Sequence, residues 1–293
     1  MGKEFYDDFP AARQVFEEAG DGLHFSISSL CFNGPADALK LTENTQPAIL
    51  TASVAALRVL QSENGIAPEM TAGHSLGEYS ALVASGGFAF TDAVRIVRLR
   101  GQYMQEAVPV GEGAMAAVLG MEREEIEKLC EDASEGDVLS PANFNCPGQI
   151  VIAGHAKAVQ RAITQVESKG KRAVLLPVSA PFHSPLMKPA GVRLEKELDQ
   201  IAVNDLKIPV ITNVEAEPNA LKDRVKGLLV TQVSHPVRWE DSIRRMIREG
   251  IERVIEIGPG KVLTGLMKRI DSNVEAKNIE DIQSLRKLGS VKN

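Results

Sequence analysis

The stretch Gly73-His74-Ser75-Leu76-Gly77 decides how the rest of this chain is interpreted, because it has the form of a sharp turn between a strand and a helix. A serine on such a turn needs neighbours without side chains, so that two backbone segments can pass closely. The following helix would direct its first N–H groups, which lack partners inside the helix, toward the serine. The pattern alone also fits an ordinary glycine-rich turn, so its flanks must decide.

The flanking residues favour a catalytic turn. A polar turn at 63–68 precedes a short candidate strand at 70–72, and a helix of small residues is predicted from Leu76 to Ala84, ended by Gly86-Gly87. The order strand, turn, helix is the one that the motif requires. Ser75 is therefore a candidate nucleophile.

Length and composition describe an ordinary globular chain. With 293 residues, 44% of them hydrophobic, it can bury a large core, as one α/β domain or as one domain with an insertion. A net charge of −6 argues against a nucleic-acid partner, and no apolar run reaches the length of a membrane span. Cys31, Cys130 and Cys146 lack metal-ligand spacing, so we expect buried, reduced thiols in a cytoplasmic protein.

Alternating strands and helices run along the chain. Helices are expected at 7–19, 45–60, 91–108 with Thr91 as N-cap, 186–200, 239–249 and from Lys261, and strands at 210–212 and 253–257. Between Pro109 and Ala180 the order is strand (114–119), helix (122–132), two strands (138–144 and 149–153), helix (156–169) and strand (172–178). This is the β-α-β-β-α-β order of ferredoxin-like units.

These elements predict an α/β protein with two subdomains. The large one, residues 1–112 and 180–293, is expected to be α/β-hydrolase-like, with a mainly parallel sheet and helices on both faces. The small one, residues 113–179, is expected to be an inserted ferredoxin-like unit. Ligands of parallel sheets bind beyond the carboxyl ends of the strands, which is where Ser75 would lie.

Arg100 is placed unusually on its helix. At about 100° per residue, it falls in the middle of the apolar face, among Ile96, Val97 and Tyr103. A buried arginine keeps its charge and needs an anionic partner, and its planar fork suits a carboxylate. Either a structural ion pair or an acidic substrate meets that need, and the nearby candidate nucleophile favours the substrate.

His183 has the most suitable position of the five histidines for a general base. It follows the strand at 172–178 in the loop Pro181-Phe182-His183-Ser184-Pro185, and strand-end loops are where catalytic groups gather. A serine hydroxyl needs such a base. A helix-capping role is the alternative for His183, and His74 is expected to point away from Ser75 as a surface or capping residue. No acidic residue stands out as the third member of a triad.

The chain closely resembles the bacterial malonyl-CoA:acyl carrier protein transacylases over nearly its whole length. The resemblance rests on 73–79, on 98–105, on Pro181-Phe182-His183-Ser184 and on further matches at 45–48, 143–149 and 258–266. It implies a ping-pong transfer of malonyl from malonyl-CoA, through Ser75, to the phosphopantetheine thiol of acyl carrier protein. No resident cofactor is implied, since phosphopantetheine is carried by the partner protein.

The resemblance also implies residue roles. His183 would be the general base, held by the main-chain carbonyl of Gln232, which explains the missing acid. Arg100 would pair with the free malonyl carboxylate, and the Leu76 amide would supply one oxyanion donor. Phe182 is a weak indication against a methylmalonyl pocket.

One part of the family pattern is missing. The family starts with a strand and a Gly-Gln-Gly-x-Gln loop that supplies the other oxyanion contact, and this sequence begins just after that loop. Loss of one such donor costs about 3–4 kcal/mol of transition-state stabilisation. We expect the native chain to begin upstream of Met1, the alternative being a shortened, non-catalytic relative.

Two other functions stay open on the sequence. A serine esterase or thioesterase would pass the acyl group to water, but would not need Arg100 on an apolar face. A carrier-protein-binding relative without chemistry would form no covalent adduct on Ser75. We expect a monomer, and since carrier proteins are acidic, candidate docking residues are Lys188, Lys261, Lys268 and Arg269.

Overall fold

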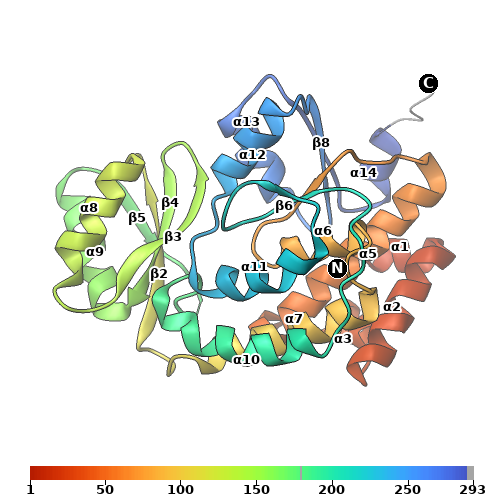
Figure 1. Ribbon diagram of the computed structural model, residues 1–293, viewed down its shortest axis with the longest axis horizontal. Coiled ribbons are helices and arrows are strands. Elements are labelled where there is room, and N and C mark those ends of the chain that lie inside the picture. Colours follow the sequence, from red (N-terminus) through yellow and green to blue (C-terminus); the bar gives the residue numbers. More distant parts are fainter. Residues whose placement is uncertain (179, 289–293) are drawn as a thin grey trace.

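The computed structural model describes residues 1–178 and 180–288 as a mixed α/β structure (Figure 1). Its helices are α1 (Lys3–Asp8), α2 (Pro10–Leu23), α3 (Ile27–Asn33), α4 (Ala36–Lys40), α5 (Thr42–Asn64), α6 (Gly77–Ala84), α7 (Phe90–Glu106), α8 (Arg123–Ser134), α9 (Ala156–Ser168), α10 (Lys188–Asp199), α11 (Lys222–Ser234), α12 (Trp239–Arg248), α13 (Val262–Ile270) and α14 (Ile282–Lys287). Its strands are β1 (Thr71–Ala72), β2 (Gly113–Leu119), β3 (Leu139–Cys146), β4 (Gln149–His155), β5 (Arg172–Leu175), β6 (Val210–Ile211), β7 (Pro218–Asn219), β8 (Arg253–Ile257) and β9 (Glu275–Ile279).

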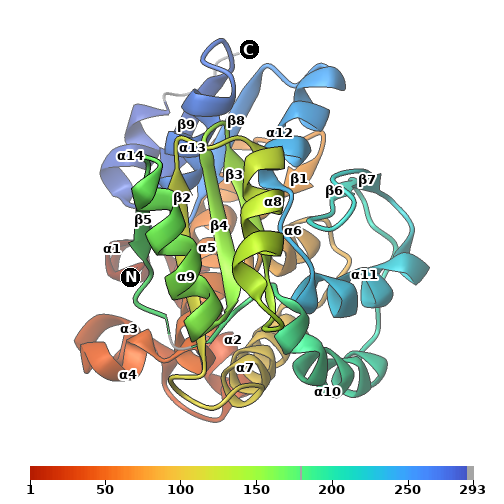
Figure 2. The same ribbon diagram turned by 90° about the vertical axis from the view of Figure 1, so that its left-hand side faces the viewer.

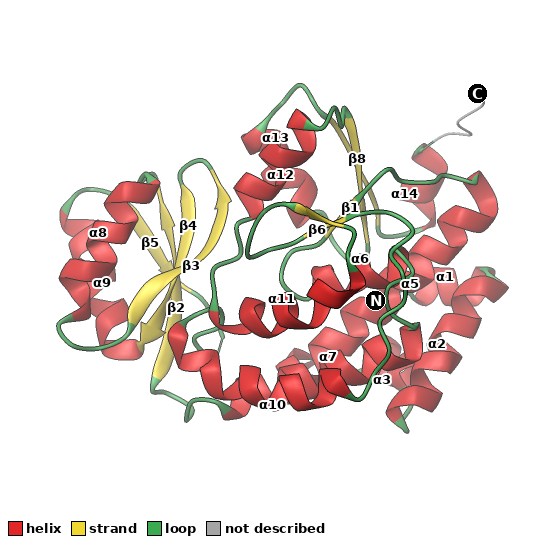
Figure 3. Cartoon of the chain, viewed as in Figure 1, coloured by secondary structure: helices red, strands yellow, loops and turns green. Residues whose placement is uncertain are grey.

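Helices α2, α5 and α7 form the main helical layer (Figure 3). Their facing sides are apolar, with Phe16, Val54 and Val97 buried in one core. Gly101 allows α7 to approach α5, because a Cβ there would lie 2.6 Å from the Thr42 carbonyl oxygen. Arg100, the neighbour of this glycine, is therefore carried on a firmly packed helix. Within the described ranges, no helix is both long and apolar enough to cross a membrane.

The middle of the chain forms a four-stranded antiparallel sheet in the order β3-β4-β2-β5. Helices α8 and α9 cover one face of it (Figure 2), and the core between them contains Ile126, Ile152 and Val159. The element order β2, α8, β3, β4, α9, β5 follows the expected alternation. The subdomain limits at 113 and 179 stay a prediction.

The described residues do not form the mainly parallel sheet that the alternating pattern predicts. Among the strands of residues 1–178 and 180–288, parallel pairing within sheets joins only β1 to β6, two residues each, and β8 to β9. Strand β7 pairs antiparallel with β6, and every pairing of the four-stranded sheet is antiparallel. The alternation of strands and helices gives the order of the elements but not the length of the strands or their partners. For this reason it overestimates the parallel sheet.

Several element boundaries also differ from the prediction. The helix expected at 7–19 is two helices, because Pro10 starts α2. Helix α7 begins at Phe90 with Ala89 as its N-cap residue, so Thr91 is not the cap. Helix α11 was not predicted, since its sequence holds a glycine and several β-branched residues that are poor helix formers.

Segments far apart in the sequence meet near the centre of the molecule. The turn between β1 and α6, helix α7, helix α11 and the loop before α10 lie side by side there (Figure 1). This meeting point is where the predicted site residues lie.

Candidate active site

The turn from β1 to α6 holds Ser75 in a left-handed backbone conformation, with φ of 54°. Gly73 makes this turn possible, because a Cβ at that position would lie 1.9 Å from the carbonyl carbon of Gly77. At Gly77, by contrast, a Cβ would meet nothing within 4 Å. The steric argument from the sequence is therefore correct for the first glycine and not for the second.

His183 lies against Ser75. It sits before α10 with φ of 58° and is 3% exposed. Its Nε2 is 2.7 Å from the Ser75 Oγ, and its Nδ1 donates to the Gln232 carbonyl oxygen at 2.9 Å. A carbonyl can only accept, so this contact fixes the proton on Nδ1 and leaves the Nε2 lone pair facing the hydroxyl.

The surroundings of His183 keep its ring uncharged. Burial, followed by the positive charge of Arg100, lowers the pKa of His183 from 6.5 to about 3. The neutral ring is the form that can accept a proton from Ser75. The arrangement is a serine and a histidine oriented by a carbonyl in place of a carboxylate.

Arg100 is buried beside the same hydroxyl, with 2% of its surface exposed. Its Nη2 donates to the Ser75 Oγ at 3.0 Å and to the Gln232 Oε1 at 2.9 Å, and its Nη1 donates to the Gln46 Oε1 at 2.7 Å. Within residues 1–178 and 180–288, no carboxylate forms an ion pair with it. The structural ion pair considered from the sequence is thus not found there, and a full positive charge faces the candidate nucleophile.

The Leu76 amide lies at the start of α6, next to Ser75. The amides that follow it are bonded, Gly77 N–H to the His74 carbonyl and Glu78 N–H to the Ser75 carbonyl. The Leu76 N–H donates to no acceptor among the described residues. It is therefore free to receive a negatively charged oxygen.

Gln232 contributes more than the carbonyl that the resemblance implies. It is fully buried on α11, and its side-chain amide donates to the Ser75 carbonyl at 2.9 Å and to the Glu78 Oε2 at 2.8 Å. Its side-chain oxygen accepts from Arg100. Gln232 thus contacts His183 through its main-chain carbonyl, and Arg100 and Ser75 through its side chain.

Sequence reasoning missed three further residues of this network. Gln46 binds Arg100, while the carboxylate of Glu78 and the amide of Asn213 lie behind Ser75. Gln46 and Glu78 stand inside stretches already singled out, at 45–48 and 73–79, so their positions were a usable signal. Asn213 follows a two-residue strand and carries no signal of its own.

His74 is a correction to the sequence interpretation. It was expected on the surface or at a helix cap, but it is half-buried. Its Nε2 lies 2.9 Å from the Asn145 Oδ1, and its ring centre is 5.6 Å from that of Trp239. Burial lowers its pKa. His74 thus connects the turn between β1 and α6 to β3, through Asn145, and to α12, through Trp239.

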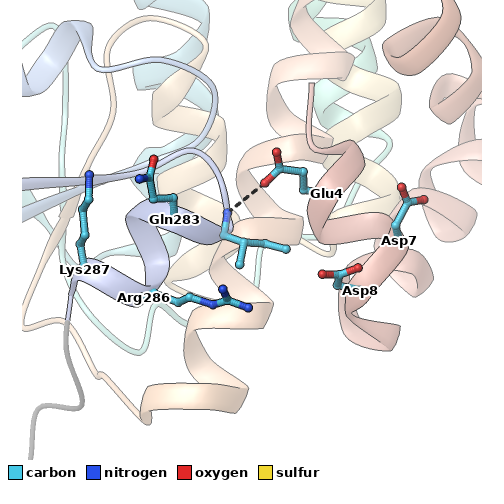
Figure 4. A pocket seen from close by; sticks show the side chains of 7 residues that line it. Glu4, Asp7, Asp8, Gln283, Arg286 and Lys287 are labelled. Carbon is cyan, nitrogen blue, oxygen red and sulfur yellow. Dashed lines mark hydrogen bonds between the residues drawn. The ribbon is translucent and has the colours of Figure 1, made fainter.

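Other features of the described residues lie outside this site. Cys31, Cys130 and Cys146 are free and buried, and the described ranges contain no group of His, Cys, Asp and Glu suited to a metal ion. A surface hollow of about 610 Å³ lies between α1 and α14 (Figure 4). There the Arg286 side chain extends toward Asp8, Glu4 and Asp7 lie on the same side as Asp8, and none of the predicted site residues lines the hollow.

Residues 1–292 match the acyl transferase domain family. The chain belongs to this family. It is 50% identical over 287 residues to the malonyl CoA-acyl carrier protein transacylase of Bacillus subtilis (strain 168), which covers 97% of this chain and 90% of that protein. It is also 50% identical over 274 residues to the transacylase of the same name from Escherichia coli (strain K12), covering 93% and 89%.

Solved structures of relatives have the same fold. The malonyl CoA-acyl carrier protein transacylase from Clostridium perfringens Atcc 13124 superposes with a TM-score of 0.95 at 44% identity, over 98% of this chain and 91% of that chain. A malonyl-transacylase solved in complex with a type II PKS acyl-carrier protein gives 0.96 at 43% identity, over 100% and 94%. The mixed α/β architecture is therefore that of these acyltransferases.

Proposed function

We propose that this acyltransferase moves a malonyl group from malonyl-CoA to the phosphopantetheine thiol of acyl carrier protein, through an ester on Ser75. The observation that carries the proposal is the contact of one hydroxyl with both His183, at 2.7 Å, and Arg100, at 3.0 Å. A base and a cation on the same serine suit a substrate that is both a thioester and a carboxylate.

In the first half-reaction Ser75 becomes acylated. The Oγ–H proton passes to the His183 Nε2 while Oγ bonds to the thioester carbon. The C–S bond then breaks, and the CoA sulfur leaves with the proton from Nε2. His183 is neutral before the step because burial and Arg100 lower its pKa, so it accepts the proton without first losing one.

In the second half-reaction the carrier thiol takes the place of CoA. Its S–H proton passes to the His183 Nε2, and its sulfur attacks the malonyl ester carbon. The ester C–O bond breaks and Ser75 Oγ recovers the proton. The same base thus serves both directions, as a ping-pong mechanism requires.

Arg100 is the proposed clamp for the free malonyl carboxylate. Its partners in the structure, Gln46, Gln232 and Ser75, are all neutral. A carboxylate would supply the missing charge and form two parallel bonds with the guanidinium. The clamp would favour malonyl over acetyl, since an acetyl thioester has no free carboxylate.

The unbonded Leu76 amide is the proposed oxyanion donor. It adjoins the nucleophile at a helix N-terminus, where negative charge is favoured. An activated thioester needs no further electrophile, and for this reason we propose no resident cofactor.

The remaining proposals concern setting and partners. We propose a cytoplasmic monomer with a large subdomain at 1–112 and 180–293 and a small one at 113–179. Lys188, Lys261, Lys268 and Arg269 are exposed, so they are available to an acidic carrier protein. Changing each to Glu should raise the KM for the carrier, and unchanged values would remove that residue from the docking surface.

The test compares transfer with hydrolysis on one thioester. The chain is incubated with malonyl-CoA and either holo or apo acyl carrier protein, and malonyl-carrier and free malonate are measured by mass spectrometry. We expect malonyl-carrier only with the holo form, formed faster than malonate. Release of malonate at the same rate with and without carrier would identify a thioesterase instead.

A further inference from the structure

The backbone of Ser75 needs outside support. A residue with a side chain rarely adopts a φ of 54°, and it does so only where the surroundings enforce it. Helix α6 begins after the turn, so the helix itself gives no bond to the Ser75 N–H. The question is which residues hold the turn in this shape.

Asn213 supplies the bond at the start of the turn. It lies just after β6 and is 1% exposed. Its Nδ2 donates to the Gly73 carbonyl at 2.7 Å, and its Oδ1 accepts from the Ser75 N–H at 2.6 Å. One carboxamide therefore spans the two peptide groups between which the chain reverses.

The backbone of Asn213 is held by hydrogen bonds at both its N–H and its carbonyl group. Its backbone N–H donates to the Glu78 Oε2 at 3.0 Å, and its carbonyl accepts from the Arg238 N–H at 2.9 Å. The same Glu78 oxygen accepts from Gln232, which also binds the Ser75 carbonyl. Both the N–H and the C=O of Ser75 are thus held by side chains distant in the sequence.

We propose that Asn213 is a positioning residue for the nucleophile: its side-chain amide sets the backbone of Ser75, and with it the direction of Oγ toward His183. The inference rests on the proposed acyl transfer and adds a residue to it. Among the hydrogen bonds of the described residues, none joins Asn213 to the Ser75 hydroxyl, His183 or Arg100, so it acts through the turn and not on the reacting atoms.

The carboxamide satisfies both contacts because it carries a donor and an acceptor on separate atoms. The Gly73 carbonyl needs a donor and the Ser75 N–H needs an acceptor. In Asn213→Asp an anionic oxygen would replace the donor and face the Gly73 carbonyl. In Asn213→Ala both buried backbone groups would lose their partners. The two substitutions remove the same function by different means.

Asn219 provides a matched control. It is also a buried asparagine, 3% exposed, in the same segment, and its side chain also spans a turn, donating to the Leu221 carbonyl at 3.1 Å and accepting from the Leu221 N–H at 3.2 Å. In the part of the chain that the structure describes, neither of these bonds nor any other hydrogen bond of its side chain reaches the Ser75 turn. Asn219→Ala therefore removes a comparable pair of bonds without touching the nucleophile.

The experiment measures the rate and the amplitude of acylation separately. Wild type, Asn213→Asp, Asn213→Ala and Asn219→Ala are mixed with malonyl-CoA, quenched over time and weighed intact, and their Tm values are recorded. The same four proteins are treated with phenylmethylsulfonyl fluoride, an uncharged reagent for activated serines. Unfolding lowers the amplitude, whereas a misdirected hydroxyl lowers the rate constant.

We expect the rate constants of both Asn213 variants to fall about 100-fold with either reagent, as for a reacting atom displaced by about 1 Å. The apparent affinity for malonyl-CoA should not change, because Arg100 keeps its bonds to Gln46 and Gln232. Asn219→Ala should lose Tm but keep the wild-type rate constant.

Three results would overturn the inference. A wild-type rate constant in Asn213→Asp would show that the amide is not needed. An equal slowing in Asn219→Ala would show only a general loss of stability. Absence of a malonyl adduct on the wild-type protein would remove the proposed function itself, and the inference with it.

Discussion

Arg100 donates a hydrogen bond from Nη2 to the Oγ of Ser75 at 3.0 Å, so a fully charged guanidinium touches the candidate nucleophile in the interior of the protein. Its charge has no carboxylate partner among the described residues. We propose that this contact links reactivity to substrate choice, because a carboxylate bound to the guanidinium would bring its acyl carbon close to the hydroxyl.

Removing the cation should lower activity and selectivity together. Hydrogen bonds to charged groups contribute about 1.5–3 kcal/mol, so Arg100→Ala should lower kcat/KM for malonyl-CoA by about 10- to 150-fold. The slow acylation by acetyl-CoA should change much less. The measurement is the ratio of the two kcat/KM values by a coupled assay.

Arg98→Ala is the control for this substitution. Arg98 lies on the same helix, is half-buried and binds the Asn44 side chain away from Ser75. Its loss should leave the malonyl-to-acetyl ratio unchanged. A ratio that stays at the wild-type value in Arg100→Ala would refute the clamp.

Acid should destabilise the protein through His183. Burial, followed by the charge of Arg100, lowers its pKa from the ordinary 6.5 to about 3 in the folded chain. The unfolded chain therefore binds more protons between these limits, and stability falls as the pH drops below 6.5. At pH 5 the cost from this group is about 2 kcal/mol relative to neutral pH. Urea unfolding at pH 7 and pH 5 should show this extra loss in wild type and not in His183→Asn. Equal losses would contradict it.

Glu78 should have the opposite effect. Burial raises its pKa from 4.5 to about 7, although its bonds from Asn213 and Gln232 and the charge of Arg100 oppose the rise. The folded chain then binds more protons between pH 4.5 and 7, so the stabilisation present at low pH is lost as the pH rises through 7. The free energy of unfolding of Glu78→Gln, relative to that of wild type, should therefore rise by about 3 kcal/mol as the pH increases from 4 to 8. A pH-independent difference in the free energy of unfolding would show that the carboxyl titrates normally.

The two glycines of the turn should respond differently to the same change. Gly73→Ala places a Cβ 1.9 Å from the Gly77 carbonyl carbon and should lower stability by about 3 kcal/mol or more. Gly77→Ala meets nothing within 4 Å and should alter stability by at most about 1 kcal/mol. Thermal unfolding of both variants checks this, and equal effects would contradict the steric account.

The sequence predicts the local chemistry of this site better than its wider support. Motifs and periodicity act over a few residues, and they predict the turn at Ser75, the helical position of Arg100 and the strand-end position of His183. Their closeness in space is visible only in the fold. Gln46 lies in a stretch that the sequence singles out, but its contact with Arg100 across 54 residues is visible only in the fold. Asn213 has no local signal, because its role comes from a contact with Ser75 across 138 residues.

In the fold, too, elements with a local sequence pattern are predicted well, and elements that depend on distant residues are not. Most helices with a clear apolar face were predicted near their true limits, whereas α11 was missed because its sequence favours no helix strongly. The parallel sheet was overestimated because strands of two residues, such as β1 and β6, have no pattern of their own. Their pairing depends on neighbours far along the chain.

The most direct test is intact mass spectrometry after brief exposure to malonyl-CoA. The account predicts one malonyl adduct on the wild-type chain, none on Ser75→Ala, and a weak adduct on Arg100→Ala that no longer exceeds the adduct from acetyl-CoA. A folded wild-type chain without an adduct, or an adduct that persists in Ser75→Ala, would contradict the central claim that Ser75 carries the acyl group.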